Sequence, residues 1–246
     1  MPTDTLEQSL VLIKPDALKN SLTGYIVSQL SEFHTGLRFA AAKIVHVNRI
    51  LADEHYAEHR GKVFFPGLLD FIMGKIHYPD EPWKRRVIAF VYQGPDAVRK
   101  IRDLVGPTNP HEAREKRPGC IRSLGTIVPI LDANGKTVGQ RMENLIHASA
   151  NAADAEREVK LWFQPADMPP SMHAYPVVTS PGHYYYHEGK LATAYQPGDF
   201  CFITPGSLVW SSDMDVLNAL IQGKPAAYSL ETVAAKYLIN VLQEEN

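Results

Sequence analysis

Short apolar runs alternate with helical segments over the first two thirds of the chain, and this order limits its possible folds. Four runs predict buried strands because turn residues bound them: 9–13, 37–47, 87–92 and 145–148. The segments between them have apolar residues at helical spacing. This order predicts an α+β, ferredoxin-like sandwich in which helices cover a small antiparallel sheet.

Residues that favour the first turn of a helix precede most of the helical segments. The expected helices are those from Ser21 through Phe33, Asn48 through His59, Pro95 to about Val105 and Asn151 through Phe163, with a short one at Phe65–Met73. Pro, Gly and charged residues predict a loop from 106 to about 125. An Asn-Gly pair between two apolar runs predicts a β-hairpin at about 126–140, which we interpret as a passive surface insertion.

The amino-acid composition changes after Pro165. Four prolines between 167 and 181 suit a linker or a wrapped arm. Residues 182–210 are rich in Tyr, Phe and turn residues and should form strands, and 213–245 should form two helices. We therefore expect one domain at 1–165 and a C-terminal extension at 166–246. The extension is too apolar for a disordered tail, so it should pack on its own or a neighbouring subunit.

Charge, apolar stretches and cysteines in the sequence argue against nucleic acid binding, membrane insertion and secretion. The net charge is −2, so no overall basic field attracts nucleic acid or an acidic membrane. The longest apolar stretches are too short to span a bilayer. The two cysteines, Cys120 and Cys201, do not suggest a disulfide framework, and no secretory signal is visible. We expect a cytoplasmic protein.

Phosphate chemistry could centre on His147, which ends a short apolar strand. Glu158 follows 11 residues later on the next helix and could turn back to orient the imidazole. A neutral imidazole held by a carboxylate is a competent nucleophile towards phosphorus. Phosphoryl transfer also needs cations, which Lys14, Arg102 and Arg122 could supply. Each residue alone is weak, because a lone His usually packs and a lone Lys or Arg is usually solvated.

The ordered set of motifs is much more specific than any member. Residues of about 8 to 165 resemble the nucleoside diphosphate kinase family. The matching segments, in order, are Leu12-Ile13-Lys14-Pro15-Asp16, His55-Tyr56, Phe64-Phe65-Pro66-Gly67-Leu68, Thr108-Asn109-Pro110, Pro118-Gly119-Cys120-Ile121-Arg122, Asn144-Leu145-Ile146-His147 and Ala155–Phe163. Residues of about 75–86 look like a charged arm inserted into that pattern, and the hairpin looks like a second insertion.

The resemblance implies a ping-pong reaction in which a nucleoside triphosphate phosphorylates His147 and a nucleoside diphosphate then collects the phosphoryl group. It also implies Mg²⁺ carried by the nucleotide and a homo-oligomer. In this family pattern Glu158 would orient His147, with Ser149 nearby, and Lys14 and Tyr56 would contact the transferring phosphate. Arg102, Thr108 and Arg122 would bind the phosphate chain. Asn144 would contact the ribose, and Phe64 would stack on the base.

Several neighbours depart from the family pattern, and other readings remain open. Ala148 and Ala150 stand where the family generally has Gly and Asp, and Ser123-Leu124 replaces Gly-Asp. The alternative function is a catalytically weak, nucleotide-binding scaffold that recruits partners through its extension. Two histidine pairs, His55 with His59 and His183 with His187, could suggest metal sites, but neither has an obvious third ligand.

Overall fold

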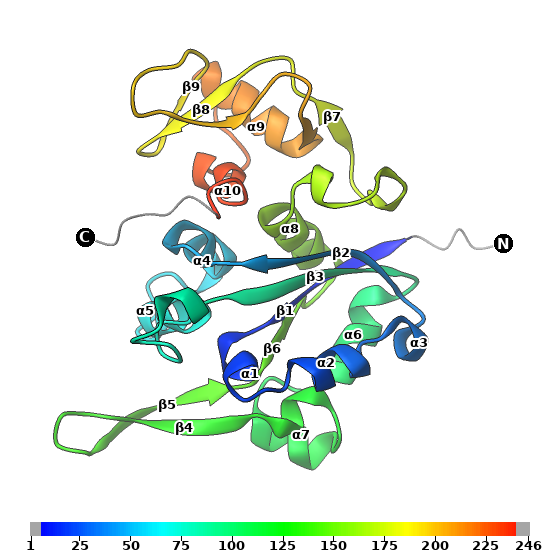
Figure 1. Cartoon of the computed structure of the whole chain (residues 1–246), viewed down its shortest axis with the longest axis vertical. Coiled ribbons are helices and arrows are strands. Elements are labelled where there is room, and N and C mark those ends of the chain that lie inside the picture. The colour runs from blue at the N-terminus through cyan, green and yellow to red at the C-terminus, as the bar shows by residue number, and fades with distance from the viewer. Residues whose placement is uncertain (1–5, 240–246) are drawn as a thin grey trace.

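A four-stranded antiparallel sheet forms the centre of the first domain in the computed structural model, which describes residues 6–239 (Figure 1). The strand order is β2-β3-β1-β6. These strands are β1 (Glu7–Ile13), β2 (Arg38–Val45), β3 (Val87–Gly94) and β6 (Ile146–Ala148). The α+β class and the antiparallel sheet covered by helices are therefore confirmed.

Alternation along β1 separates two hydrophobic cores, because successive side chains of a strand point to opposite faces. Leu10 and Leu12 face one core, where α4 (Arg49–His55), α5 (Phe65–Ile72) and α8 (Ala152–Trp162) cover the sheet. Val11 and Ile13 face the other core, covered by α2 (Thr23–Gln29) and α6 (Ala97–Val105). The sheet is thus buried on both faces, which explains why residues 10–13 of the central strand β1 are all apolar.

Two of the three predicted helix caps are confirmed, and one is wrong. The side chains of Asn48 and Asn151 accept backbone N–H groups at the starts of α4 and α8. Ser21 instead lies in the left-handed region with φ 58°, and α2 begins after Leu22 without a side-chain cap. The expected single helix breaks after α2, and Ser31 caps the separate α3 (Glu32–Thr35).

Pro95 does not lie in the first helical turn as expected. It precedes Asp96, which is the N-cap of α6. The chain also forms a short helix that we did not predict, α1 (Pro15–Lys19). The helix expected through His59 ends at His55 as α4 and is followed by a 3-10 turn, η1 (Ala57–His59). The charged arm at 75–86 contains a 3-10 turn, η2 (Pro82–Lys84).

The predicted loop at 106–125 is largely helical. Asn109 caps α7 (Pro110–Lys116), with Pro110 in its first turn, and η3 (Ile121–Leu124) follows. Asn followed by Pro is a recognised helix start, and the charged residues after it conceal the helix because they face solvent. Gly106 packs so closely here, with φ +83°, that a Cβ would lie 2.2 Å from Cys120 Sγ.

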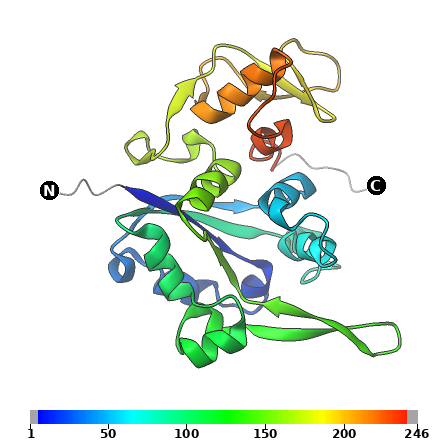
Figure 2. The same cartoon turned by 180° about the vertical axis from the view of Figure 1, so that it is seen from behind.

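The predicted hairpin is present as β4 (Thr126–Leu131) and β5 (Thr137–Glu143). It projects from the sheet in both views (Figure 1, Figure 2). The Asp132 carboxylate accepts the backbone N–H groups of Asn134 and Lys136 and so closes the turn.

The C-terminal extension forms small sheets and helices above α4 and α8 (Figure 1). After η4 (Pro165–Asp167) and η5 (Pro170–Met172), β7 (Val177–Thr179) pairs with β11 (Leu208–Trp210). A second sheet has the order β10-β8-β9, formed by β8 (Tyr184–His187), β9 (Lys190–Ala192) and β10 (Phe200–Ile203). Two helices follow, α9 (Ser211–Ile221) and α10 (Leu230–Ala234).

The extension is β-rich and then helical, in the order that the sequence predicts. Its second helix ends at Ala234, and the last part of the helix expected to reach 245 falls at 240–246, outside the described residues. The proline-rich segment is a wrapped arm, since Gln8 Nε2 donates to the Met172 carbonyl at 2.8 Å. No helix within residues 6–239 is long and apolar enough to cross a membrane.

Candidate active site

The backbone before β6 adopts an unusual conformation that presents two site residues. Leu145, between Asn144 and His147, has φ +70°, a region that non-glycine residues rarely occupy. Its N–H donates to Asp16 Oδ2 at 2.8 Å, and its carbonyl accepts the N–H of Lys14 at 3.0 Å. Asp16 is fully buried. The chain at Lys14–Asp16 therefore holds the strained residue in place.

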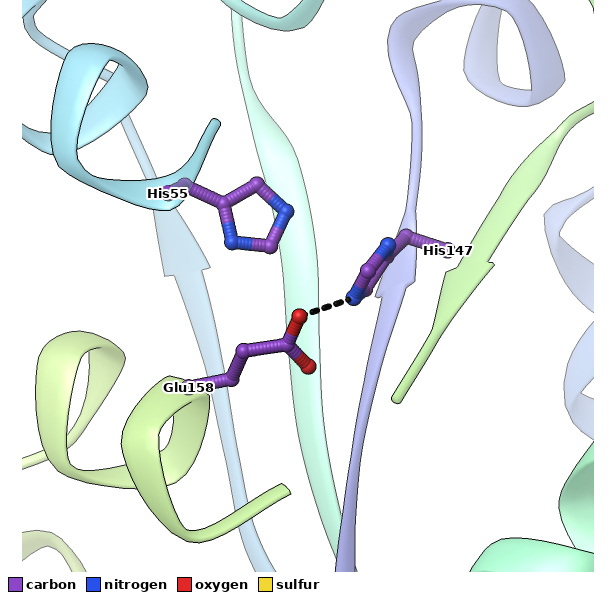
Figure 3. Close-up of side chains that lie close together, drawn as sticks. All are labelled: His55, His147 and Glu158. Carbon is purple, nitrogen blue, oxygen red and sulfur yellow. Dashed lines mark ion pairs between the residues drawn. The ribbon is translucent and has the colours of Figure 1, made fainter. Parts of the chain in front are cut away.

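His147 lies beside Glu158, as the sequence predicts (Figure 3). Nε2 of His147 is 3.0 Å from Oε1 of Glu158, within ion-pair distance. The other carboxylate oxygen accepts the Ser149 hydroxyl at 2.7 Å. The Ser149 hydroxyl also accepts the Leu10 N–H at 3.1 Å, which ties the group to the central strand.

Glu158 is ionised over the working range of most proteins. Burial alone raises the pKa of its carboxyl, but the His147 and His55 rings and the Ser149 hydroxyl outweigh burial and lower the pKa to about 2. The His147 side chain is 21% exposed while that of Glu158 is 5% exposed. The carboxylate is thus shielded behind a ring that a ligand can reach.

His55 also contacts the His147 ring, on the same side as Glu158 (Figure 3). Its ring meets the His147 ring edge to face, with centroids 4.6 Å apart, and it is 2% exposed. Burial, and then the neighbouring His147, lower the pKa of His55 to about 3, so the ring is neutral. Trp162 Nε1, which can only donate, lies 3.2 Å from His55 Nδ1. Nδ1 must therefore accept, and the ring hydrogen resides on Nε2.

This tautomer bears on a metal site at His55, His147 and Glu158. One ligand atom from each of the three residues lies within 4.8 Å of the others. A metal needs the lone pair of a ring nitrogen, whereas His55 Nε2 carries the hydrogen. The cluster therefore does not fit a metal ion in this arrangement. His59 does not join it, because its ring stacks on Tyr56 instead.

In the second pair of histidines considered for a metal site, each ring also has a different neighbour. His183 stacks on the Tyr185 ring, whereas His187 lies 3.3 Å from the Asp199 carboxylate.

Two cationic residues, Lys14 and Arg122, bond to the backbone of the two residues that precede His147. Lys14 is buried and donates to Asn144 Oδ1, while Asn144 Nδ2 donates to the Thr108 carbonyl at 2.9 Å. Burial lowers the pKa of Lys14, and the nearby Arg122 acts in the same direction. Arg122 donates to the carbonyls of Gly106 and Ile146, both at 3.1 Å. Burial, with repulsion from Arg102, lowers the pKa of Arg122 to about 10, so it remains charged at neutral pH.

Tyr56 lies close enough to Glu158 and Arg122 for both charges to act on its hydroxyl. Burial raises the pKa of its hydroxyl, followed in size by the charge of Glu158, so Tyr56 remains a hydrogen-bond donor. It contacts the His55 ring at 4.5 Å between centroids. Further out, its ring stacks on His59, which meets Phe64 at 5.6 Å. Phe64 is 55% exposed, so a ligand can reach part of its ring.

The remaining predicted site residues lie at the rim. Thr108 is exposed and enters the site through its backbone carbonyl. Arg102 on α6 is exposed and lines a shallow pocket of about 390 Å³ together with Ala150 and Asn151. The structure thus brings Lys14, Tyr56, Arg122, Asn144, Ser149 and Glu158 around His147, with Phe64, Arg102 and Thr108 at the edge.

Sequence reasoning missed Asp16 and His55. Asp16 follows β1 in the Lys-Pro-Asp segment, where an aspartate normally indicates a turn and gives no sign of its bond to the distant Leu145 N–H. His55 was overlooked because the motif assigns the functional role of the pair to its neighbour Tyr56. Trp162 can donate to a histidine, but only the tertiary structure brings its Nε1 to His55 Nδ1.

Comparisons with known proteins show the family that the sequence resembles. A family model described as nucleoside diphosphate kinase matches residues 7–168. The nucleoside diphosphate kinase of Thermus thermophilus is 37% identical over 163 residues, which cover 66% of this chain and 99% of that relative.

Two solved structures are similar over the same share of the chain. The nucleoside diphosphate kinase of Aquifex aeolicus has a TM-score of 0.52 at 27% identity, covering 67% of this chain and 99% of that one. The Borrelia burgdorferi enzyme, a transition-state mimic with bound vanadate and ADP, has a TM-score of 0.51 at 30% identity, covering 67% and 91%.

Proposed function

Because the chain belongs to the nucleoside diphosphate kinase family, and is thus an enzyme of phosphoryl transfer between nucleotides, we propose that its reaction is ping-pong and passes through a phosphohistidine at His147. The observation that carries the proposal is the setting of His147: its side chain is partly exposed, its Nε2 lies 3.0 Å from Glu158, and Arg122 bonds to the carbonyl of the preceding residue, Ile146.

The Glu158 contact selects the reacting nitrogen. A carboxylate beside Nε2 favours the tautomer with hydrogen on Nε2, which leaves the lone pair on Nδ1. In the first half-reaction Nδ1 attacks the γ-phosphorus of a nucleoside triphosphate, the bond from phosphorus to the β,γ-bridging oxygen breaks, and the nucleoside diphosphate leaves. The ring becomes cationic, and Glu158 stabilises it. A second diphosphate then takes the phosphoryl group by the reverse step.

Cationic and polar side chains position the phosphate chain. Lys14, Arg102 and Arg122 stabilise its negative charge, and the Tyr56 hydroxyl and Thr108 donate hydrogen bonds. Asn144 binds the ribose hydroxyl, and Phe64 stacks on the base, which suits many bases because each has a π-face. The substrates proposed for this chain are nucleoside di- and triphosphates. ADP is bound in the Borrelia relative.

Mg²⁺ accompanies the nucleotide in this proposal. The residues facing the phosphate positions are cationic, so they suit a polyanion better than a bare cation, and the ion would be held by phosphate oxygens. It would neutralise charge that develops on those oxygens.

Three wider features are also part of the proposal. The catalytic domain is 1–165 and the extension 166–246, which the match to residues 7–168 supports. The protein is cytoplasmic, consistent with two free cysteines. It is a homo-oligomer, supported by β2 ending the sheet with one edge unpaired among the described residues. The scaffold alternative is less favoured, since a scaffold does not need the group around His147.

Incubation of the full chain with a γ-labelled nucleoside triphosphate tests the proposal. We expect an acid-labile phosphoenzyme that a different nucleoside diphosphate discharges, and a variant His147→Ala that binds nucleotide but transfers nothing. Absence of labelled wild-type enzyme, or turnover in the variant, would exclude His147 as the carrier.

A further inference from the structure

The C-terminal extension contacts the two helices that frame the site on their outer sides. In α4, Glu54 Oε2 accepts the Thr232 hydroxyl of α10 at 2.6 Å. At the start of the same helix, Asn48 Nδ2 donates to the Leu238 carbonyl at 3.1 Å. At the end of α8, the Phe163 carbonyl accepts Trp210 Nε1 at 2.8 Å. Both helices are therefore tied to the C-terminal extension, α4 by the segment around α10 and α8 by Trp210 of β11.

The segment from Ser229 to Ile239 joins two hydrophobic cores. Leu230 and Val233 pack in the extension's own core with residues of β8, β10 and α9. Ala235 and Ile239 pack in the domain core together with Leu51 and Ala52 of α4 and with Trp162 of α8. Since a packed core resists small displacements, α10 transmits the position of the extension to α4.

A buried ion pair fixes this segment to α9. Lys236 Nζ lies 2.9 Å from Asp213 Oδ2, with the two side chains 1% and 2% exposed. The Tyr228 hydroxyl donates to the other oxygen of Asp213 at 2.8 Å. Removal of either charge would strand its partner in the core, so the pair holds one geometry. The segment thus has a rigid base on the side away from α4.

The end of α4 is where this support reaches the chemistry. Glu54, which receives Thr232, is followed directly by His55 and Tyr56, and the His55 ring contacts His147. Arg157 of α8 donates to the Glu54 carbonyl at 3.4 Å and lies 3.7 Å from Glu158. We propose that the extension is an intramolecular strut for the phosphoryl-transfer site, and that Thr232 is a positioning residue acting through Glu54 on His55 and Tyr56.

This inference rests on the proposed function and adds a dependence that the shorter relatives cannot share. The Thermus enzyme is matched over 99% of its length by 66% of this chain. In this chain, by contrast, part of the domain core is supplied by Trp210, Ala235 and Ile239 from the extension.

Substitution of Thr232 tests the strut in the full-length protein. Thr232→Val keeps the shape but removes the donor to Glu54, Thr232→Ser keeps the hydroxyl, and Thr193→Val is a control in an exposed loop of the extension. Because a small misplacement of catalytic groups costs much of the rate, we expect phosphoenzyme formation at saturating ATP to slow about tenfold in Thr232→Val. Thr232→Ser and Thr193→Val should remain within about twofold of wild type, and ATP affinity should not change.

Two results would overturn the inference. One is a Thr232→Val rate equal to wild type, and the other is a parallel loss of rate and nucleotide-binding capacity, which indicates unfolding and not misplacement. Amide hydrogen exchange tests the support of α4 independently of activity. Exchange at 49–56 should accelerate in Thr232→Val but not in Thr193→Val. If wild type formed no phosphoenzyme, the proposed function would fail, while unchanged exchange at 49–56 would independently refute the strut.

Discussion

Replacement of Glu158 by Gln should slow phosphorylation of His147 about a hundredfold. Gln keeps the shape and can still accept the Ser149 hydroxyl, so the change removes charge alone. Two unit charges 3.0 Å apart interact by about 5.5 kcal/mol at an effective dielectric constant of about 20. If about half a charge has developed on the ring in the transition state, about 2.8 kcal/mol is lost, which is about a hundredfold in rate.

Rapid-quench measurement of phosphoenzyme at saturating labelled ATP gives this rate directly. Glu156→Gln is the matched control, because Glu156 lies on the same helix with a side chain 49% exposed and paired with Lys160. We expect the control to match wild type and ATP affinity to be unaffected in both variants. A Glu158→Gln rate within about threefold of wild type would refute the argument that carboxylate charge supports the cationic ring.

Three further perturbations follow from the same contacts. His55→Phe should lower the free energy of unfolding by about 1–3 kcal/mol, because it strands the Trp162 donor, whereas His55→Gln should restore part of it; equal urea midpoints would contradict this. Arg122→Lys should slow phosphoenzyme formation about tenfold, because Lys cannot bridge two carbonyls; an unchanged rate would contradict it. Glu158 has a pKa lowered to about 2, so it stabilises the fold above about pH 4.5 and this stability disappears towards pH 2. Urea unfolding should therefore show the gap between wild type and Glu158→Gln shrinking over that range, and a constant gap would contradict it.

Local signals in the sequence predicted much of the fold. The alternating strands, the Asn caps of α4 and α8 and the Asn-Gly hairpin depend on neighbouring residues, so each can be recognised in a short window. Ser21 failed as a cap because serine occurs in turns as well as at helix starts, and here it lies in the turn after α1 with φ 58°. The helix in the predicted loop failed because its charged surface conceals any apolar periodicity.

In the site, too, contacts between residues close in sequence could be predicted, and contacts between distant residues could not. His147 and Glu158 lie close in sequence, so their contact across β6 and α8 could be anticipated. Asp16 with Leu145, and Trp162 with His55, are more than a hundred residues apart, and only the assembled sheet and helices bring them together. The support of α4 by the extension is likewise tertiary, since nothing near Thr232 in sequence indicates Glu54 as its acceptor.

Mapping the phosphate on the labelled protein tests the central claim most directly. Protein incubated with a nucleoside triphosphate, digested at neutral to alkaline pH and analysed by mass spectrometry should carry one acid-labile phosphoryl group on His147. That group should disappear after addition of a different nucleoside diphosphate. An acid-stable phosphate on Ser149, or a transferable phosphate on any residue other than His147, would contradict the account.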